Sequence, residues 1–112
     1  MHQSMNVASN AKMIEALKAE FIGEAAEVMR VTLSPGARKG LVDTLGGAIW
    51  LAYGLAKRCG ISYSELDADV IRKAGDGIQD GHKLETDYGD LSLLKKHFES
   101  GNLRGFGEDK RK

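Results

Sequence analysis

The fold is decided by residues 14–28, which read IEALKAEFIGEAAEV. Apolar residues recur in this stretch every three or four positions, which is the period of one helix face: Ile14, Leu17, Phe21, Ala25 and Val28. Glu24 follows Phe21 by three residues and precedes Val28 by four, so it falls inside the apolar stripe. The stretch therefore predicts an amphipathic helix that carries one carboxylate toward the core.

A carboxylate on a core-facing helix surface is costly unless something pairs with it. Glu20 and Glu27 border the stripe on either side of Glu24. Three carboxylates at one edge of a core repel one another unless a cation holds them, so the pattern points to a metal site in a helical bundle. Two other interpretations stay open: Glu24 pairs with a Lys or Arg of another helix, or it reaches solvent at the edge of the stripe.

Length and composition indicate one soluble domain. The chain has 112 residues, with 16 basic and 16 acidic side chains, and this zero net charge gives no sign of a nucleic-acid partner. The single cysteine, Cys59, rules out an internal disulfide and fits a reducing, cytoplasmic setting. We expect it to be a small core residue at a helix end. No stretch has the pattern of a signal peptide or a membrane span.

Local signals predict an all-α domain over residues 10–99, between a flexible leader (1–9) and a flexible tail (100–112). The expected helices number three to four and cover about residues 10–32, 35–59, 63–74 and 93–99.

The ends of these helices have recognisable signals. Ser34 before Pro35 is typical of a helix start, and Gly60 of the residue after a helix end. Ser62 and Glu65 have the spacing of a capping box. The glycine-rich stretch 75–91 predicts a loop, with a hairpin near Asp80-Gly81.

The helix expected at 35–59 is apolar on most of its circumference, so it needs cover on most sides. Gly46, Gly47 and Gly54 each cost roughly 0.5–1 kcal/mol relative to Ala inside a helix. They are useful where another helix or a ligand comes very close. We expect a homo-oligomer, a dimer or tetramer, with this helix at its centre; the alternative is a tightly packed monomer core.

The order of these motifs resembles a known family. A helix with Glu24-x-x-Glu27 precedes a central helix that reads LVDTLGGAIWL over residues 41–51. This resembles the all-α nucleoside triphosphate pyrophosphohydrolases, the MazG-like enzymes and their phosphoribosyl-ATP-cleaving relatives, over about residues 10–75. That family carries E-E-x-x-E on one helix and E-x-x-D on the next. Here Gly23 replaces the first Glu, and Thr44 and Gly47 occupy the positions of the second motif.

The resemblance implies a MazG-like helical bundle, completed by oligomerisation, that cleaves a nucleotide between its α and β phosphates with Mg²⁺ or Mn²⁺. Its implied metal-binding and catalytic residues are Glu24, Glu27 and Asp43, the last one residue before the expected Glu. Lys73 is the implied phosphate contact, or else a favourable cation at a helix C-terminus. Trp50 and Tyr53 would stack on the base, or else be core or interface aromatics.

Three function classes remain open from the sequence. The first is the Mg²⁺-dependent pyrophosphohydrolase. The second is a member of the same fold whose metal site has decayed and which acts as a nucleotide-binding or oligomeric interaction protein. The third is a helical adaptor unrelated to nucleotides, which predicts a basic partner for Glu24.

Overall fold

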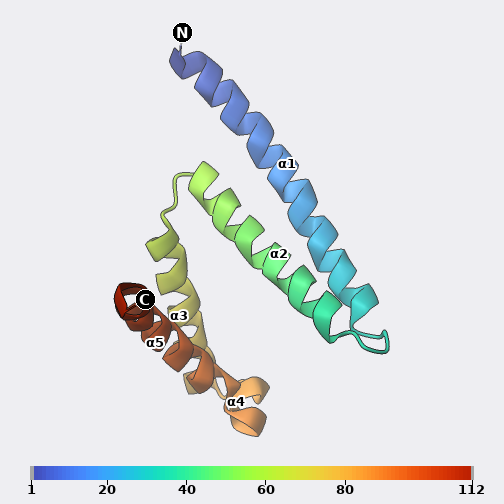
Figure 1. Cartoon of the computed structure of the whole chain (residues 1–112), viewed down its shortest axis with the longest axis vertical. Coiled ribbons are helices and arrows are strands. Elements are labelled where there is room, and N and C mark those ends of the chain that lie inside the picture. The colour runs from blue at the N-terminus through green and yellow to red at the C-terminus, as the bar shows by residue number, and fades with distance from the viewer. Residues whose placement is uncertain (1, 112) are drawn as a thin grey trace. The chain divides into compact units, whose positions relative to one another are not determined.

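The structure is a computed structural model that describes the backbone of residues 2–111 and the side chains of residues 7–101. Five helices and no strand occupy this range: α1 (His2–Val31), α2 (Arg38–Arg58), α3 (Tyr63–Asp80), α4 (Lys83–Tyr88) and α5 (Asp90–Arg111) (Figure 1). The predicted all-α fold is confirmed, with one helix more than expected. The chain divides into two compact units, Met1–Tyr63 and Ser64–Lys112.

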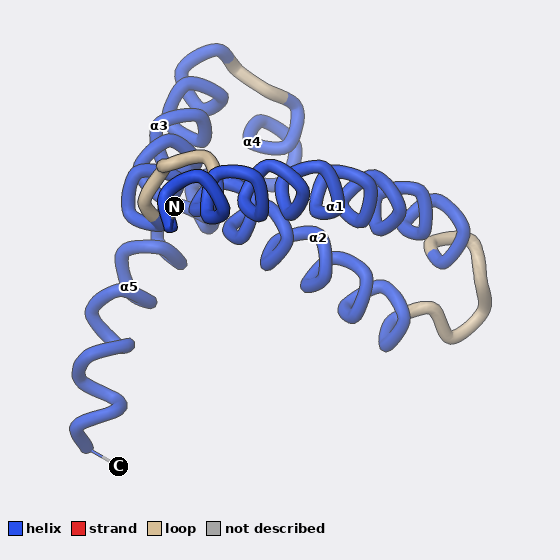
Figure 2. Tube along the Cα trace, turned by 90° about the horizontal axis from the view of Figure 1, so that it is seen from above, coloured by secondary structure: helices blue, strands red, loops and turns tan. Residues whose placement is uncertain are grey.

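The first unit is a hairpin of two antiparallel helices, α1 and α2, joined by the turn at residues 32–37 (Figure 2). Three glycines of α2, each seven residues from the next, face three side chains of α1 with the same spacing. The pairs are Gly40 with Val31, Gly47 with Glu24, and Gly54 with Leu17. Seven residues make nearly two full helical turns, so these pairs form one seam between the helices. We call them the glycine ladder.

The sequence prediction is wrong for the start of α2 and correct for its end. Gly36 has φ +66°, outside the helical region, so the chain cannot be helical from Pro35 onward. The helix begins instead at Arg38, and its N-cap, Ala37, makes no side-chain hydrogen bond, so the predicted Ser34 cap is wrong. At the other end Gly60 is confirmed as the C′ residue, with φ +84°. The Ile61 amide donates to the Ala56 carbonyl (2.9 Å), as in a Schellman motif.

In the second unit the predicted loop at 75–91 is wrong. α3 begins at Tyr63 as predicted but continues through Gly75 and Gly77 to Asp80, where Gly81 (φ +74°) ends it. A Cβ on Gly77 would lie 2.5 Å from Leu91 Cδ1, so the missing side chain of Gly77 leaves room for Leu91 of α5. This glycine therefore allows close packing and does not end the helix. The expected hairpin is absent from the described residues.

A short helix, α4, fills part of the expected loop. His82 caps it, its Nδ1 accepting from the Leu84 amide (3.0 Å). Glu85 then ties α4 to α5 by accepting from the Ser92 amide (2.9 Å) and from the Ser92 hydroxyl (2.5 Å). These bonds hold the pKa of Glu85 below its ordinary value of 4.5. The last helix starts at Asp90, after Gly89 in the left-handed region, and not at Leu93.

The outer helix ends also differ from the expected boundaries. α1 begins at His2 and not near Asn10, and α5 continues to Arg111. The side chains of residues 1–6 and 102–112 lie outside the described part, and the predicted flexible leader and tail fall mainly there. No helix of the described part is long and apolar enough to cross a membrane.

The described core is small. Its buried members are Leu17, Leu51, Ala56, Ala74 and the polar Thr44. Cys59 is exposed at the end of α2, so the prediction of a core cysteine is wrong. Because α1 covers only one side of α2, four large apolar side chains of α2 stay exposed: Val42, Leu45, Ile49 and Trp50.

Candidate metal and nucleotide site

Glu24 lies in the middle of the glycine ladder, half-buried between α1 and α2. A Cβ on Gly47 would lie 2.9 Å from Glu24 Cδ and 3.0 and 3.1 Å from its two carboxylate oxygens. The carboxylate therefore rests against the α2 backbone, where residue 47 has no side chain. The apolar stripe of α1 does carry a carboxylate toward its neighbouring helix, as the sequence predicted.

Glu24 has no basic partner in the described part of the chain. It makes no hydrogen bond and no ion pair with any side chain of residues 7–101. The adaptor hypothesis predicted such a partner, and the described residues do not provide one. A half-buried carboxylate without a protein partner is a candidate ligand for a cation.

Glu27 lies one helical turn after Glu24 on α1. Its carboxylate pairs with Arg30, and its side chain is 38% exposed. The antiparallel register that sets Gly47 against Glu24 puts Thr44, only 4% exposed, opposite Glu27. The two positions that carry carboxylates in the resembled family thus face the Glu24–Glu27 pair, but here they hold Thr and Gly.

Asp43 lies outside this arrangement. It is exposed and lines a separate hollow of about 670 Å³ with Gly36, Arg38, Lys39 and Val42. Among the described residues, no three side chains of the His, Cys, Asp and Glu types come together to hold a metal ion. Glu24 and Glu27 alone still fit one Mg²⁺, because this ion commonly takes one or two carboxylates and completes its shell with water and substrate phosphates.

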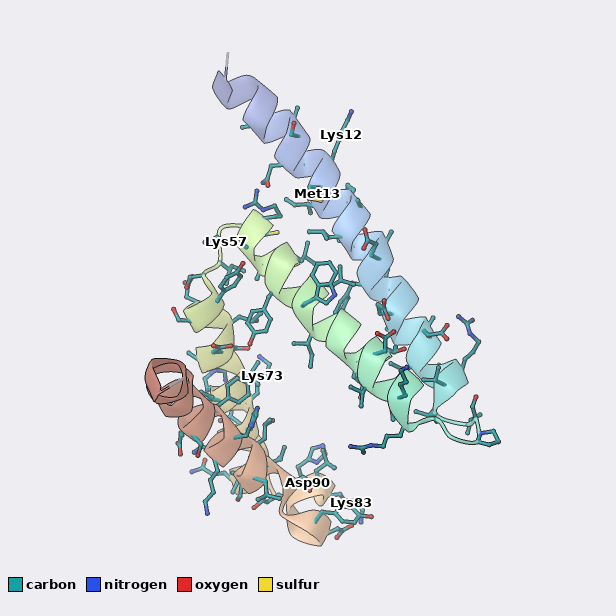
Figure 3. The ribbon with its side chains drawn as sticks, viewed as in Figure 1. Lys12, Met13, Lys57, Lys73, Lys83 and Asp90 are labelled. Atoms are coloured by element: carbon teal, nitrogen blue, oxygen red, sulfur yellow. The ribbon has the colours of Figure 1, made fainter. Side chains whose placement is uncertain are left out.

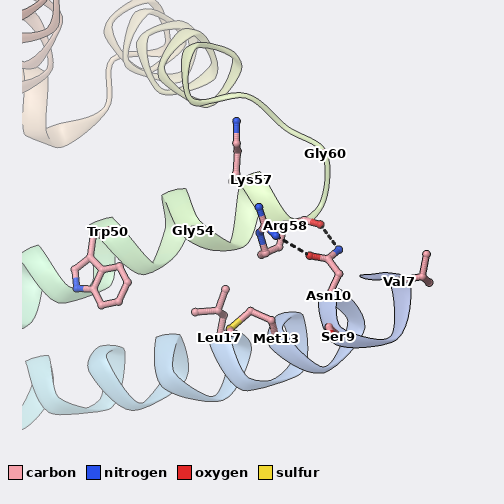
Figure 4. Close-up of a pocket in the computed structure, with 10 residues that line it drawn as sticks. All are labelled: Val7, Ser9, Asn10, Met13, Leu17, Trp50, Gly54, Lys57, Arg58 and Gly60. Atoms are coloured by element: carbon pink, nitrogen blue, oxygen red, sulfur yellow. Dashed lines mark hydrogen bonds between the residues drawn. The ribbon is translucent and has the colours of Figure 1, made fainter. Parts of the chain in front are cut away.

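A larger cavity, of about 870 Å³, opens between the N-terminal half of α1 and the C-terminal half of α2 (Figure 4). Met13, Leu17 and Trp50 give it an apolar lining, and Lys57 and Arg58 add two cations. Asn10 bridges the two helices there: its Nδ2 donates to the Arg58 carbonyl (2.8 Å), and Arg58 Nη1 donates to its Oδ1 (3.2 Å).

Sequence reasoning missed Lys57 and Arg58. Their only signal was a basic last turn of α2, which the helix dipole favours in any protein. Trp50, by contrast, was a predicted substrate-binding residue; it lines this cavity and is 61% exposed.

The other predicted substrate-binding residues have neighbours of their own. Tyr53 packs edge-to-face on Tyr63, with ring centroids 5.7 Å apart, and the Lys57 ammonium lies 5.3 Å from the Tyr63 ring. Lys73 projects from α3 in the second unit (Figure 3) and donates to Asp69 (2.6 Å). This bond, together with those from Arg72, lowers the pKa of Asp69.

Comparison with known proteins identifies the chain at the level of a family. No curated protein and no solved structure matches it. The model of the MazG-like family matches residues 7–91, a range that includes Glu24, Glu27, Thr44 and Gly47. The match extends beyond the stretch on which the resemblance was based, to the start of α5. The chain therefore belongs to the MazG-like family.

Proposed function

We propose that the protein is a Mg²⁺-dependent nucleotide pyrophosphohydrolase. Water attacks the α phosphorus of a nucleoside triphosphate, the bond to the bridging oxygen of the β phosphate breaks, and the products are a nucleoside monophosphate and pyrophosphate. The observation that carries this proposal is Glu24: half-buried, without a partner in the described chain, and one turn from a second carboxylate. Family membership supports the reaction class.

Glu24 and Glu27 are the proposed ligands of one Mg²⁺ or Mn²⁺. Such an ion neutralises phosphate charge and lowers the pKa of a bound water. To hold this ion, Glu27 would give up its ion pair with Arg30, and the freed guanidinium would be available to a phosphate. Asp43, the third ligand that the resemblance implies, is left out of this set, because it lines a separate hollow and on a helix points about 100° away from Thr44.

Trp50 is the proposed platform for the base. It follows Gly47 by one turn, about 4.5 Å along the α2 axis, so a nucleotide with its phosphates at Glu24 has its base within reach of the indole. Lys57 and Arg58 add positive charge at the far end of the cavity that Trp50 lines. Lys73 remains a proposed phosphate contact, for which it would leave Asp69, and Tyr53 a proposed aromatic neighbour of the substrate.

The second candidate is a non-catalytic member of the family that binds nucleotides or acts through its oligomer. The absence of carboxylates at Thr44 and Gly47, the positions facing Glu27 and Glu24, favours it. Both candidates include a homo-oligomer, because the exposed apolar face of α2 needs cover.

The test is pyrophosphate release from a panel of nucleoside triphosphates with Mg²⁺ or Mn²⁺, in the wild type and in Glu24→Gln. Glu15→Gln is the matched control, because Glu15 is an exposed carboxylate of the same helix. We expect release by the wild type and the control and its loss in Glu24→Gln. Nucleotide binding without release would favour the second candidate. Neither binding nor release would refute both nucleotide hypotheses.

A further inference from the structure

We infer that Gly47 is a positioning residue: by lacking a side chain, it gives the Glu24 carboxylate its place against α2. The inference rests on the proposed function of Glu24 as a cation ligand. It concerns a position where the family motif predicts an acidic residue and the chain has none.

A glycine at position 47 could have two purposes: to let α1 and α2 approach closely, or to leave room for the Glu24 carboxylate. The glycine ladder distinguishes them. A Cβ on Gly40 would lie 3.7 Å from Val31, and one on Gly54 would lie 3.9 Å from Leu17, both ordinary van der Waals contacts. The distance between α1 and α2 therefore admits a methyl group at these two positions. Of the three ladder glycines, only Gly47 has a contact as short as 2.9 Å, and there the three nearest atoms all belong to the Glu24 carboxylate. Gly47 thus makes room for a carboxylate and is not needed to bring the helices together.

The same contact predicts how a substitution acts. The atoms that a new Cβ meets are the far end of a flexible side chain, so Glu24 can rotate away while the helices keep their places. An alanine at position 47 therefore moves the carboxylate and leaves the hairpin folded. Metal ligands must be held to within about 0.5 Å for full affinity, so this displacement weakens cation binding.

A further consequence concerns the family motif. The Cβ of an aspartate at position 47 meets the same carboxylate atoms, so this hairpin cannot keep Glu24 in place and also carry an acidic side chain at position 47. In this chain the Glu24 carboxylate occupies the space that the aspartate of the family's E-x-x-D motif would need at position 47.

Calorimetric titration of the full chain with Mn²⁺ alone tests the inference. We expect the dissociation constant of Gly47→Ala to rise about 10- to 100-fold, the usual effect of losing a residue that orients a metal ligand. Gly46→Ala is the matched control: it makes the same change one residue away, where no atom lies within 4 Å of the new Cβ. Its affinity should stay within about two-fold of the wild type. Neither variant should melt below the wild type, since Ala favours a helix more than Gly.

A rescue variant checks the mechanism. Aspartate at position 24 is one methylene shorter than glutamate, so its carboxylate clears the methyl group that Gly47→Ala adds. The double variant Glu24→Asp/Gly47→Ala should therefore bind Mn²⁺ more tightly than Gly47→Ala, although Glu24→Asp alone weakens binding.

The possible outcomes are distinct. Equal affinities of Gly47→Ala and Gly46→Ala would overturn the positioning role and leave the proposed function intact. A melting temperature of Gly47→Ala far below that of Gly46→Ala would assign Gly47 to helix packing and also overturn it. Absence of Mn²⁺ binding by the wild type would overturn both this inference and the proposed function.

Discussion

At Glu24 a carboxylate occupies a helix seam whose neighbouring contacts, Val31 with Gly40 and Leu17 with Gly54, are apolar. Position 24 therefore has a stability cost that its neighbours on the ladder do not have. A charge kept in such a place by a fold this small suggests a functional reason. The proposal of a cation ligand supplies one.

Removal of this charge has an effect on stability that depends on metal. We expect Glu24→Gln to raise the free energy of unfolding by about 0.5–1 kcal/mol without divalent cations, because a neutral amide is cheaper to bury than an unpaired carboxylate. With saturating Mn²⁺ the order should reverse, since only the wild type gains ligand stabilisation. Thermal unfolding with EDTA and with Mn²⁺ measures both. A lower stability of Glu24→Gln in EDTA would show that the carboxylate has a stabilising partner.

Asp43 gives the complementary test at the residue scale. It is exposed and apart from the glycine ladder, so we expect Asp43→Ala to leave Mn²⁺ affinity within about two-fold of the wild type. Calorimetry under the same conditions as for Gly47→Ala measures this. A loss of about ten-fold or more would restore Asp43 to the ligand set.

At the scale of elements, the sequence was informative where local chemistry decides the structure. The helix predicted over residues 14–28 and the stop at Gly60 depend on a few neighbouring residues, and both are confirmed, although Phe21 and Ala25 of the predicted stripe are exposed. Prediction failed where distant contacts decide. Gly77 resembles a helix breaker, but it lies inside α3, at a place where a side chain would overlap Leu91. In the site, the stripe predicted the place of Glu24, whereas its pairing with Gly47 depends on the register between two helices, which no local pattern specifies.

The α3–α5 contact predicts different effects of the same substitution at two nearby glycines. Gly77→Val should destabilise the second unit by about 1–3 kcal/mol, because the new side chain overlaps Leu91. Gly75→Val should cost less, since its nearest neighbour is the end of Lys95 at 3.9 Å, which can move away. Amide hydrogen exchange of α5 and thermal unfolding compare the two. Equal effects would mean that the overlap with Leu91 does not decide the stability of the second unit.

The Glu85–Ser92 bonds make the α4–α5 connection sensitive to acid. The pKa of Glu85 is lowered in the folded chain, chiefly by the hydrogen bond from the Ser92 hydroxyl, so its contribution to stability is present above pH 4.5 and is lost as the pH falls through the folded pKa. We expect the amide-exchange protection factors of α4, which are corrected for the pH dependence of the intrinsic exchange rate, to decrease as the pH falls below about 4.5. Ser92→Ala should reduce this pH dependence. An unchanged pH profile in Ser92→Ala would show that other groups cause it.

At the scale of the whole molecule, the described part of the chain buries few apolar side chains and leaves many large ones exposed. Four apolar residues of the described part are buried, whereas Val42, Leu45 and Ile49 of α2 are 60%, 44% and 58% exposed. Small domains are marginally stable even when well packed, so a chain with this core gains from covering α2 with another copy of itself. The homo-oligomer proposed from the sequence is supported by these side chains more than by the α2 glycines, since Gly47 and Gly54 face α1 of the same chain.

Sedimentation at micromolar concentration should therefore give at least a dimer of the 12.1 kDa chain. Ile49→Glu should shift the mass toward the monomer, because it places a charge in the middle of the exposed α2 face, where an apolar interface cannot solvate it. Ile22→Glu, an equally large change at an exposed position of α1 (67%), is the matched control. Dissociation by Ile22→Glu alone would move the interface to α1. A wild-type monomer would leave the exposed α2 face without a second copy, and the oligomer proposal would be wrong.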